Sequence, residues 1–283
     1  MTVVTSYPGV YVEEIADGAM LSISAAKTAV PVFGAETWSY GVRRIASFFE
    51  YQTIRGSALS MDDAFDASIK AYFSNGGGVA YFMSVEDLAA EVPKYDDITL
   101  VVACGNYSTA RAAIDGLCQA GANLFGIVDG PAAEIVSTFD PAQSYSSNPH
   151  MAVYYPYLSA DWTSRDIFPS VVVAAIYCQN DRTRGVWSAP ANLTLQGGLR
   201  PKFKITDDLQ GQFNQGLAIN MIRDFGAGPT VWGAHAGRQR QLALCAGAPF
   251  VRLDGARYRQ RDAIDGVRAE QPAHLGARAL GDR

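Results

Sequence analysis

Hydrophobic positions in the first third of the chain follow two different patterns, one with a helical period and one of short continuous runs. From Phe65 through Ile69 to Phe73 they recur at helical spacing, which is the pattern of a helix with one apolar face. Ser60-Met61-Asp62-Asp63 in front of this run supplies an N-cap and acidic side chains for the first turn. We therefore predict a helix here that ends at Asn75-Gly76-Gly77-Gly78, where the glycines allow the chain to turn.

Other apolar runs are short, continuous and bounded by turn residues, which is typical of strands buried on both faces. These runs span Ala29 to Gly34, Val79 to Val85, Ile98 to Ala103 and Leu124 to Val128. A predicted helix over Ser108 to Ala120 separates the last two. This strand–helix–strand order predicts an α/β fold with a mixed, partly parallel sheet flanked by helices.

The remaining predicted elements are shorter. A short helix over Ser47 to Tyr51 interrupts an otherwise irregular stretch from Thr37 to Ile54. Further along, we predict a strand over Met151–Leu158, a buried helix over Ser170–Cys178, a polar-capped helix over Thr206–Asn214, and strands over Leu217–Arg223 and Thr230–Trp232. We find no internal repeat and no low-complexity linker.

The first residues differ in character from this core. Thr2 to Glu14 carry alternating β-branched and aromatic side chains, which Pro8-Gly9 interrupts. We expect an extended N-terminal arm here. The predicted organisation is an arm over residues 1–20 and an α/β core over residues 21–234.

Arg184-Gly185-Val186-Trp187-Ser188-Ala189-Pro190-Ala191-Asn192 fits neither a helix period nor strand alternation. We expect a tight, irregular segment packed against another part of the protein. It resembles a segment of contractile tail sheath proteins. Further blocks similar to that family, in the family's order, lie at Tyr7–Glu14, Thr28–Gly34, Ala71–Gly78, Ala152–Leu158, Gly216–Arg223 and Thr230–Ala234. The short layout without inserts is most similar to the sheaths of antifeeding-prophage-type extracellular contractile injection systems.

The resemblance implies a structural subunit and no enzyme. In that family, arms add strands to neighbouring subunits, and hexameric rings stacked in a helix surround an inner tube and contract to drive it through a target membrane. The implied partners are further copies of the chain, the inner tube protein, and baseplate and tail-terminator proteins, with no nucleic acid and no direct membrane insertion. The implied subunit-interface residues are Tyr7, Pro8, Gly9, Val10, Tyr11, Val12, Glu13, Glu14, Arg184 and Trp187.

The amino-acid composition is consistent with a folded protein that becomes part of a particle inside a cell. With 283 residues and 48% hydrophobic content, the chain is long enough to bury a substantial core. No apolar run is long enough to span a bilayer, and we find no secretory signal. The four cysteines show no metal-ligand spacing, so we expect reduced thiols. We expect the chain in the cytoplasm of the producing cell during assembly, and then in a released phage-tail-like particle.

The charge of the chain changes near Ala234. Residues 1–234 hold nine Arg, five Lys and 23 acidic residues, a net charge of −9, whereas residues 235–283 hold nine Arg, no Lys and five acidic residues, a net charge of +4. One interpretation is a basic tail that binds nucleic acid or an acidic surface. The other is a lost reading frame.

The frame hypothesis can be examined on paper. Permissible codons from Gly233 onward, read one base later, give a sequence that begins ARTLAGNDNSRYVPVRRLF and resembles the sheath C-terminal domain. We favour this interpretation. It predicts that residues 235–283 have no native fold, that the C-terminal sheath domain is missing, and that the last strands of the core expose an apolar edge.

The candidate catalytic groups all have structural explanations. His150 follows Asn148-Pro149 at a strand entrance, and no Gly-x-Ser-x-Gly motif accompanies it. The glycines after Asn75 lack the Lys and Ser or Thr of a phosphate-binding loop. Asp96-Asp97 and Asp207-Asp208 suit caps and solvated surfaces. We assign no catalytic residue, no cofactor and no metal ligand.

Charged and aromatic groups suit subunit contacts better. Only one of Glu13-Glu14 can face a neighbouring subunit from an extended arm, because successive side chains point to opposite sides. Arg43-Arg44, Arg182 and Arg184 are candidate partners for it, and Trp187 and Trp232 are candidate core or interface anchors.

Two other functions stay open at this point. A truncated sheath fragment would fail to assemble, or would cap or regulate an intact sheath. An α/β enzyme is the remaining alternative, because a fold by itself excludes no activity.

Overall fold

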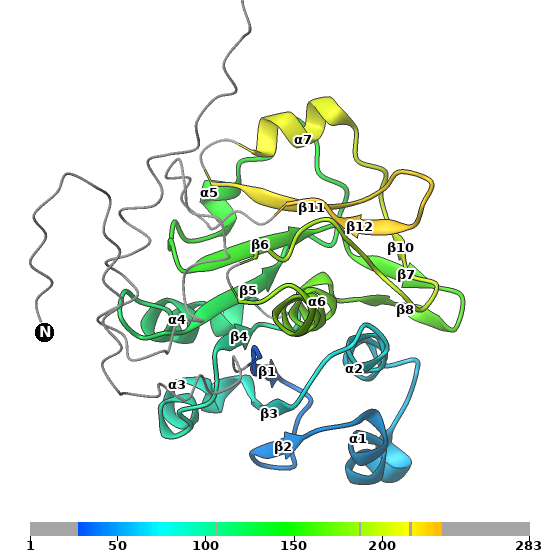
Figure 1. The fold of residues 1–283 in the computed structure, drawn as a ribbon. Coiled ribbons are helices and arrows are strands. Elements are labelled where there is room, and N and C mark those ends of the chain that lie inside the picture. The colour runs from blue at the N-terminus through cyan, green and yellow to red at the C-terminus, as the bar shows by residue number, and fades with distance from the viewer. Residues whose placement is uncertain (1–27, 106, 187, 215–216, 234–283) are drawn as a thin grey trace, which may run out of the picture.

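The computed structural model describes residues 28–105, 107–186, 188–214 and 217–233. The predicted arm and residues 235–283 lie outside the described residues. Within these ranges the fold is a three-layer α/β arrangement, with one large sheet between two groups of helices (Figure 1). The predicted fold class is confirmed.

The large sheet has nine strands in the described residues. Their spatial order is β2 (Arg43–Ile45), β3 (Ala80–Ser84), β1 (Pro31–Ala35), β4 (Leu100–Val102), β5 (Phe125–Asp129), β6 (Met151–Tyr155), β11 (Ile219–Asp224), β12 (Pro229–Val231) and β9 (Leu193–Thr194). The six strands from β3 to β11 run parallel to their neighbours. Antiparallel strands complete both ends: β2 at one, and β12 followed by β9 at the other.

Helices cover both faces because successive strand residues point in opposite directions. Phe33 packs into a core with α1 (Phe48–Arg55), α2 (Ala64–Ser74) and α6 (Pro169–Thr183), whereas its neighbour Val32 packs into a core with α3 (Leu88–Glu91) and α4 (Tyr107–Leu117). Phe213 of α7 (Asp207–Phe213) also belongs to this second core, and Pro141 of α5 (Pro141–Ser144) lines the same cavity as Phe213. Three 3-10 turns connect the elements: η1 (Gly56–Ala58), η2 (Val85–Asp87) and η3 (Val92–Lys94).

The predicted helix starts are confirmed by their caps. The side chains of Ser47, Asp63 and Thr206 accept hydrogen bonds from backbone N–H groups in the first turns of α1, α2 and α7. Helix α6 is buried along nearly its whole length and runs to Thr183, five residues beyond the predicted end.

The predicted strand over Met151–Leu158 is wrong in one respect, because it is two strands. β6 ends at Tyr155, and β7 (Leu158–Ala160) pairs with β8 (Thr163–Ile167) and β10 (Arg200–Pro201) in a separate three-stranded sheet. Pro156 lies between them, and proline has no N–H to donate to a central sheet.

Two further expectations need correction. The stretch from Thr37 to Ile54 contains edge strand β2 as well as a helix. We also expected the last strands of the core to expose an apolar edge, but β12 pairs with β9, where Leu193 is half-buried and Thr194 is exposed.

Candidate assembly surface

The carboxyl ends of the parallel strands are where an open α/β sheet usually binds a ligand. Here the end of β5 is occupied by a side chain of the protein. Asp129 accepts hydrogen bonds from the backbone N–H and the hydroxyl of Ser170, at 2.7 and 2.8 Å, and from Gly105 N at 2.7 Å. Its carboxylate therefore fills the anion position at the N-terminus of α6. Burial raises the pKa of Asp129 to about 6, against the effect of these hydrogen bonds.

Packing closes the same edge further. A Cβ atom on Gly105, which has a φ of +82°, would lie 2.6 Å from the ring of Phe168. Beside it, the hydroxyl of Thr109 in α4 donates to Glu36, which follows β1, at 3.0 Å. These contacts leave the strand ends filled by side chains of the chain.

Two cavities of the described residues are not lined by Asp129 or its partners, and the second borders the carboxyl end of β11 at Arg223 and Asp224. One, of about 460 Å³, is lined by residues of the α5 and α7 regions, including Phe139 and Phe213. The other, of about 360 Å³, is lined by Arg200, Lys204 and Arg223. Arg200 and Arg223 are paired with Asp161 and Asp207, at 2.9 and 2.7 Å, so this cavity does not concentrate unpaired positive charge.

The segment 184–192 is tight and irregular, as predicted. The backbone N–H groups of Arg184 and Gly185 donate to Asn180 O at 2.7 and 3.1 Å, and Asn180 Nδ2 donates to Ser188 O at 2.7 Å. At its end, Asn192 N donates to Val231 O at 2.8 Å. The segment therefore packs between the last turn of α6 and the antiparallel end of the sheet.

Of the predicted interface residues, only Arg184 is among those that the structure describes. It is exposed, and its Nη1 donates to Ala191 O at 3.1 Å. Tyr7 to Glu14 and Trp187 lie outside the described residues. That these residues form one interface therefore stays a prediction.

The other candidate arginines lie apart from each other. Arg43 and Arg44 are exposed on edge strand β2, and Arg44 Nε lies 3.7 Å from Asp97 Oδ2. Arg182, on α6, donates to the backbone oxygen of Gly76. The glycine run thus forms a helix end that an arginine contacts, which agrees with its predicted structural role.

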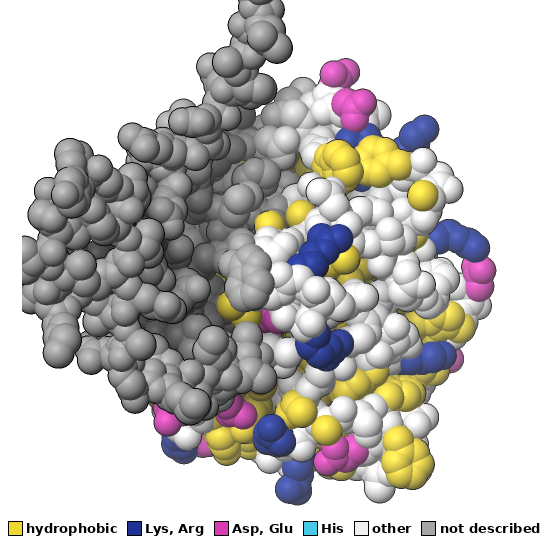
Figure 2. Space-filling model, viewed as in Figure 1, with side chains coloured by type: hydrophobic (Ala, Val, Ile, Leu, Met, Phe, Trp, Pro, Cys, Tyr) yellow, Lys and Arg dark blue, Asp and Glu magenta, His cyan; other side chains and the backbone are white. Residues whose placement is uncertain are grey.

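An exposed aromatic pair was only partly anticipated. Trp232, predicted as an anchor, is 43% exposed, and its ring centre lies 4.6 Å from that of Phe225, which is 52% exposed. Arg223 lies over the Phe225 ring at 4.7 Å. Figure 2 shows that hydrophobic side chains on this face of the described surface occur in small groups with Lys and Arg between them.

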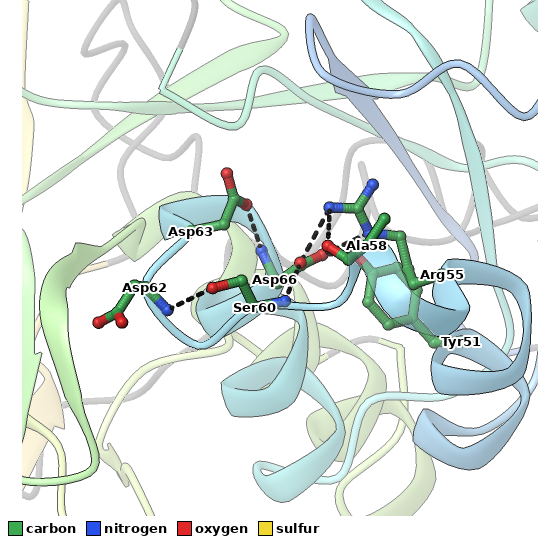
Figure 3. Close-up of polar contacts among 7 residues, drawn as sticks. All are labelled: Tyr51, Arg55, Ala58, Ser60, Asp62, Asp63 and Asp66. Carbon is green, nitrogen blue, oxygen red and sulfur yellow. Dashed lines mark hydrogen bonds and ion pairs between the residues drawn. The ribbon is translucent and has the colours of Figure 1, made fainter.

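A buried charged cluster joins α1 to α2 (Figure 3), and sequence reasoning missed it. Arg55 Nε and Nη2 donate to the two carboxylate oxygens of Asp66 at 2.8 and 2.9 Å. Ser60 N donates to Asp66 at 2.9 Å, and the hydroxyl of Tyr51 also donates to it. The cluster fixes α1, whose Phe49 is 78% exposed. Its members all lie between residues 51 and 66 but match no spacing motif.

Other predicted roles can be compared directly. His150 directly precedes β6, and its backbone N–H donates to Asn148 Oδ1 at 2.8 Å, so it is the predicted loop histidine at a strand entrance. Across the described ranges, no group of three or more His, Cys, Asp or Glu side chains is placed to hold a metal ion. Within the same ranges, no helix is long and apolar enough to cross a membrane.

Comparisons with known proteins were made for the whole chain. No protein-family model and no curated protein matches it. A solved structure of an extracellular contractile injection system, the PVC sheath complex in the contracted state, is 46% identical, with a TM-score of 0.73, and the match covers 84% of this chain and 69% of that chain.

Two structures of the anti-feeding prophage are also similar. Its baseplate in the contracted state is 34% identical, with a TM-score of 0.67, over 84% of this chain and 70% of that chain. Its helical sheath in the contracted state is 28% identical, with a TM-score of 0.63, over 96% of this chain and 79% of that chain.

Proposed function

This chain belongs to the sheath family of contractile injection systems and is a structural sheath subunit; on that premise, we propose that copies of it surround an inner tube and contract to drive the tube through a target membrane. The observation that carries the proposal is 46% identity to a sheath complex along 84% of the chain. A likeness of this extent covers the whole core and does not depend on one motif.

The proposed work of the subunit comes from contacts between subunits. An extended arrangement of rings stores free energy, and a shorter, wider arrangement with better contacts releases it, so that no nucleotide is consumed. The filled carboxyl end of β5 supports this function over an enzymatic one. Asp129 and Phe168 occupy the place where an α/β enzyme would bind its ligand.

The proposed partners follow from the same function. They are further copies of the chain in stacked hexameric rings, the inner tube protein, and baseplate and tail-terminator proteins. We propose that the chain assembles in the cytoplasm of the producing cell and leaves it in a released particle. Residues 7–14 would be the donated strand of the N-terminal arm, and Arg184 and Trp187 would contribute to the subunit interface.

We also propose that the native reading frame is lost at or just after Ala234. The reversal of charge beyond this residue supports this, and so does the sheath-like sequence that permissible codons give when they are read one base later. The nucleotide sequence across codons 230–283 tests it. A second frame that continues the sheath domain is the expected result, and a second frame without such a sequence would make the basic tail genuine.

A specific observation favours one second candidate. Because the net charge reverses beyond Ala234, the chain could cap or regulate a sheath made by an intact subunit, or fail to assemble. Co-expression of an epitope-tagged chain with the complete particle separates the three cases. Tag along the whole sheath supports the proposed subunit, tag at one end alone supports a cap, and particles without tag contradict both.

A further inference from the structure

Ala29 and Val30 connect the N-terminal residues to the central strand β1, and Ala29 is held by α6. Its backbone N–H donates to Asp181 Oδ2 at 2.8 Å, and its carbonyl oxygen accepts from the thiol of Cys178 at 3.2 Å. The two side chains of α6 that make these bonds, Cys178 and Asp181, lie about one turn apart on the same side of the helix. Ala29 is only 1% exposed, so these two bonds are made without competition from bulk water.

Val30 is held from the neighbouring strand. Its N–H donates to Thr99 Oγ1 at 2.8 Å, and its carbonyl oxygen accepts from Thr99 N at 2.9 Å. Thr99 directly precedes β4, the neighbour of β1 in the sheet. All four backbone polar groups of Ala29 and Val30 therefore have partners before β1 begins.

Asp181, the acid that accepts from Ala29, is unfavourable for the stability of its own helix, α6. Asp181 lies in the last turn of α6, where the helix dipole disfavours negative charge. Burial raises its pKa to about 6. An acid at this position weakens the helix end, so its gain lies in the hydrogen bond to Ala29.

The residue before it holds a different segment. Asn180 accepts from Arg184 N and Gly185 N and donates to Ser188 O. Adjacent residues in one turn of α6 thus bond to the segment 184–192 and to the start of β1. The start of β1, to which the N-terminal residues lead, and the segment 184–192 are therefore bonded to the same helical turn.

We propose that Asp181 is a positioning residue that fixes where the N-terminal arm leaves the core, and that the last turn of α6 couples this point to the segment 184–192. The inference rests on the proposed function, because only an arm that is donated to another subunit needs a fixed attachment, here called the root, at Ala29 and Val30. A force on the arm would act on the hydrogen bonds of Ala29 and Val30 together before it acted on those of β1.

Tryptic cleavage tests the root directly. Lys27 is the first Lys or Arg of the chain, and cleavage after it requires Thr28, Ala29 and Val30 to enter the protease in an extended form. Asp181→Ala removes the acceptor of Ala29 N, so we expect the fragment 1–27 to be released about tenfold faster, as for the loss of a hydrogen bond to a charged group. Asp181→Asn keeps an acceptor oxygen and should stay close to the parent rate.

Asp208→Ala is the matched control, because Asp208 is an exposed acid in α7. It should release the fragment at the parent rate. Equal rates for Asp181→Ala and the parent would overturn the proposal. If Asp181→Ala fails to fold, amide hydrogen exchange of the parent decides: protected amides at Ala29 and Val30 support the root, and exchange at the rate of a free chain overturns it.

Both measurements use the unassembled chain. If Ala29 and Val30 are protected but the chain enters no sheath, even when it continues after Ala234 in the second reading frame, the result would contradict the proposed function alone. Incorporation into a sheath with a freely exchanging root would contradict the present inference alone.

Discussion

Asp129 accepts two hydrogen bonds from Ser170, one from the backbone N–H at 2.7 Å and one from the hydroxyl at 2.8 Å. The pair joins the end of β5 to the start of α6 and is fully enclosed. Because burial raises the pKa of Asp129 from 3.8 to about 6, the folded state holds the proton more tightly than the unfolded state does.

This pKa shift gives a pH dependence with a definite sign. The stability that the group contributes is fully present below its unfolded pKa of 3.8 and is lost as the pH rises through about 6. Asp181, whose pKa burial also raises to about 6, acts in the same direction. We expect the thermal midpoint to fall between about pH 4 and about pH 6, and to fall less in Asp129→Asn. An identical pH profile for the parent and the variant would show that Asp129 does not titrate in this range.

Breaking the ion pair between Arg55 and Asp66 should cost far more stability than breaking one at the surface. The Arg55 side chain is 8% exposed and that of Asp66 is 0% exposed, so Asp66→Asn leaves a buried charge without its partner. We expect a loss of about 3–5 kcal/mol in the free energy of unfolding, measured in urea. Asp161→Asn, which removes the exposed pair with Arg200, is the control and should cost less than about 1 kcal/mol. Equal losses in the free energy of unfolding for Asp66→Asn and Asp161→Asn would contradict this prediction.

Gly77 is required by its packing. A Cβ atom there would lie 2.3 Å from the ring of Tyr72, which is fully buried and whose hydroxyl donates to Gly78 O. Gly77→Ala should therefore cost about 1–3 kcal/mol through overpacking. Gly116→Ala in α4 is the matched control, since nothing lies within 4 Å of its Cβ position, and it should leave the thermal midpoint unchanged or raise it. The idea fails if both variants unfold at the same temperature.

A substitution of Arg184 should affect assembly without affecting folding. It is exposed, and its described bond is to Ala191 O within its own segment. We expect Arg184→Ala, made in the chain that continues after Ala234 in the second reading frame, to keep the thermal midpoint of its parent and to reduce incorporation of the tagged chain into particles. Arg111→Ala changes another exposed arginine, on α4, and should incorporate normally. Normal incorporation of Arg184→Ala would remove this residue from the interface.

Much of the core could be predicted from the sequence because local signals agreed with the final packing. The apolar spacing from Phe65 to Phe73 and the acids before it correspond to α2, with Asp63 as its N-cap. The continuous apolar runs became strands buried on both faces. Edge strand β2 was missed because it is three residues long and its two arginines are exposed, so neither hydrophobicity nor alternation marked it.

The groups that hold the fold together were harder to predict. Asp66 stands inside an apolar helix and Asp181 at a helix end, where an acid usually faces solvent. Their partners, Arg55 and Ala29, lie 11 and 152 residues away in the sequence. No spacing rule connects such pairs, because the fold brings them together. The resemblance to sheath proteins identified the family where the site chemistry could not.

Electron microscopy of two purified chains tests the central claim most directly. One is the chain as printed, and the other continues after Ala234 in the second reading frame. The account predicts hollow helical tubes with six-fold rings from the second chain, and none from the first. A second chain that is soluble and folded yet forms no tubes would contradict its function as a sheath subunit. Tubes from the printed chain alone would contradict the lost reading frame.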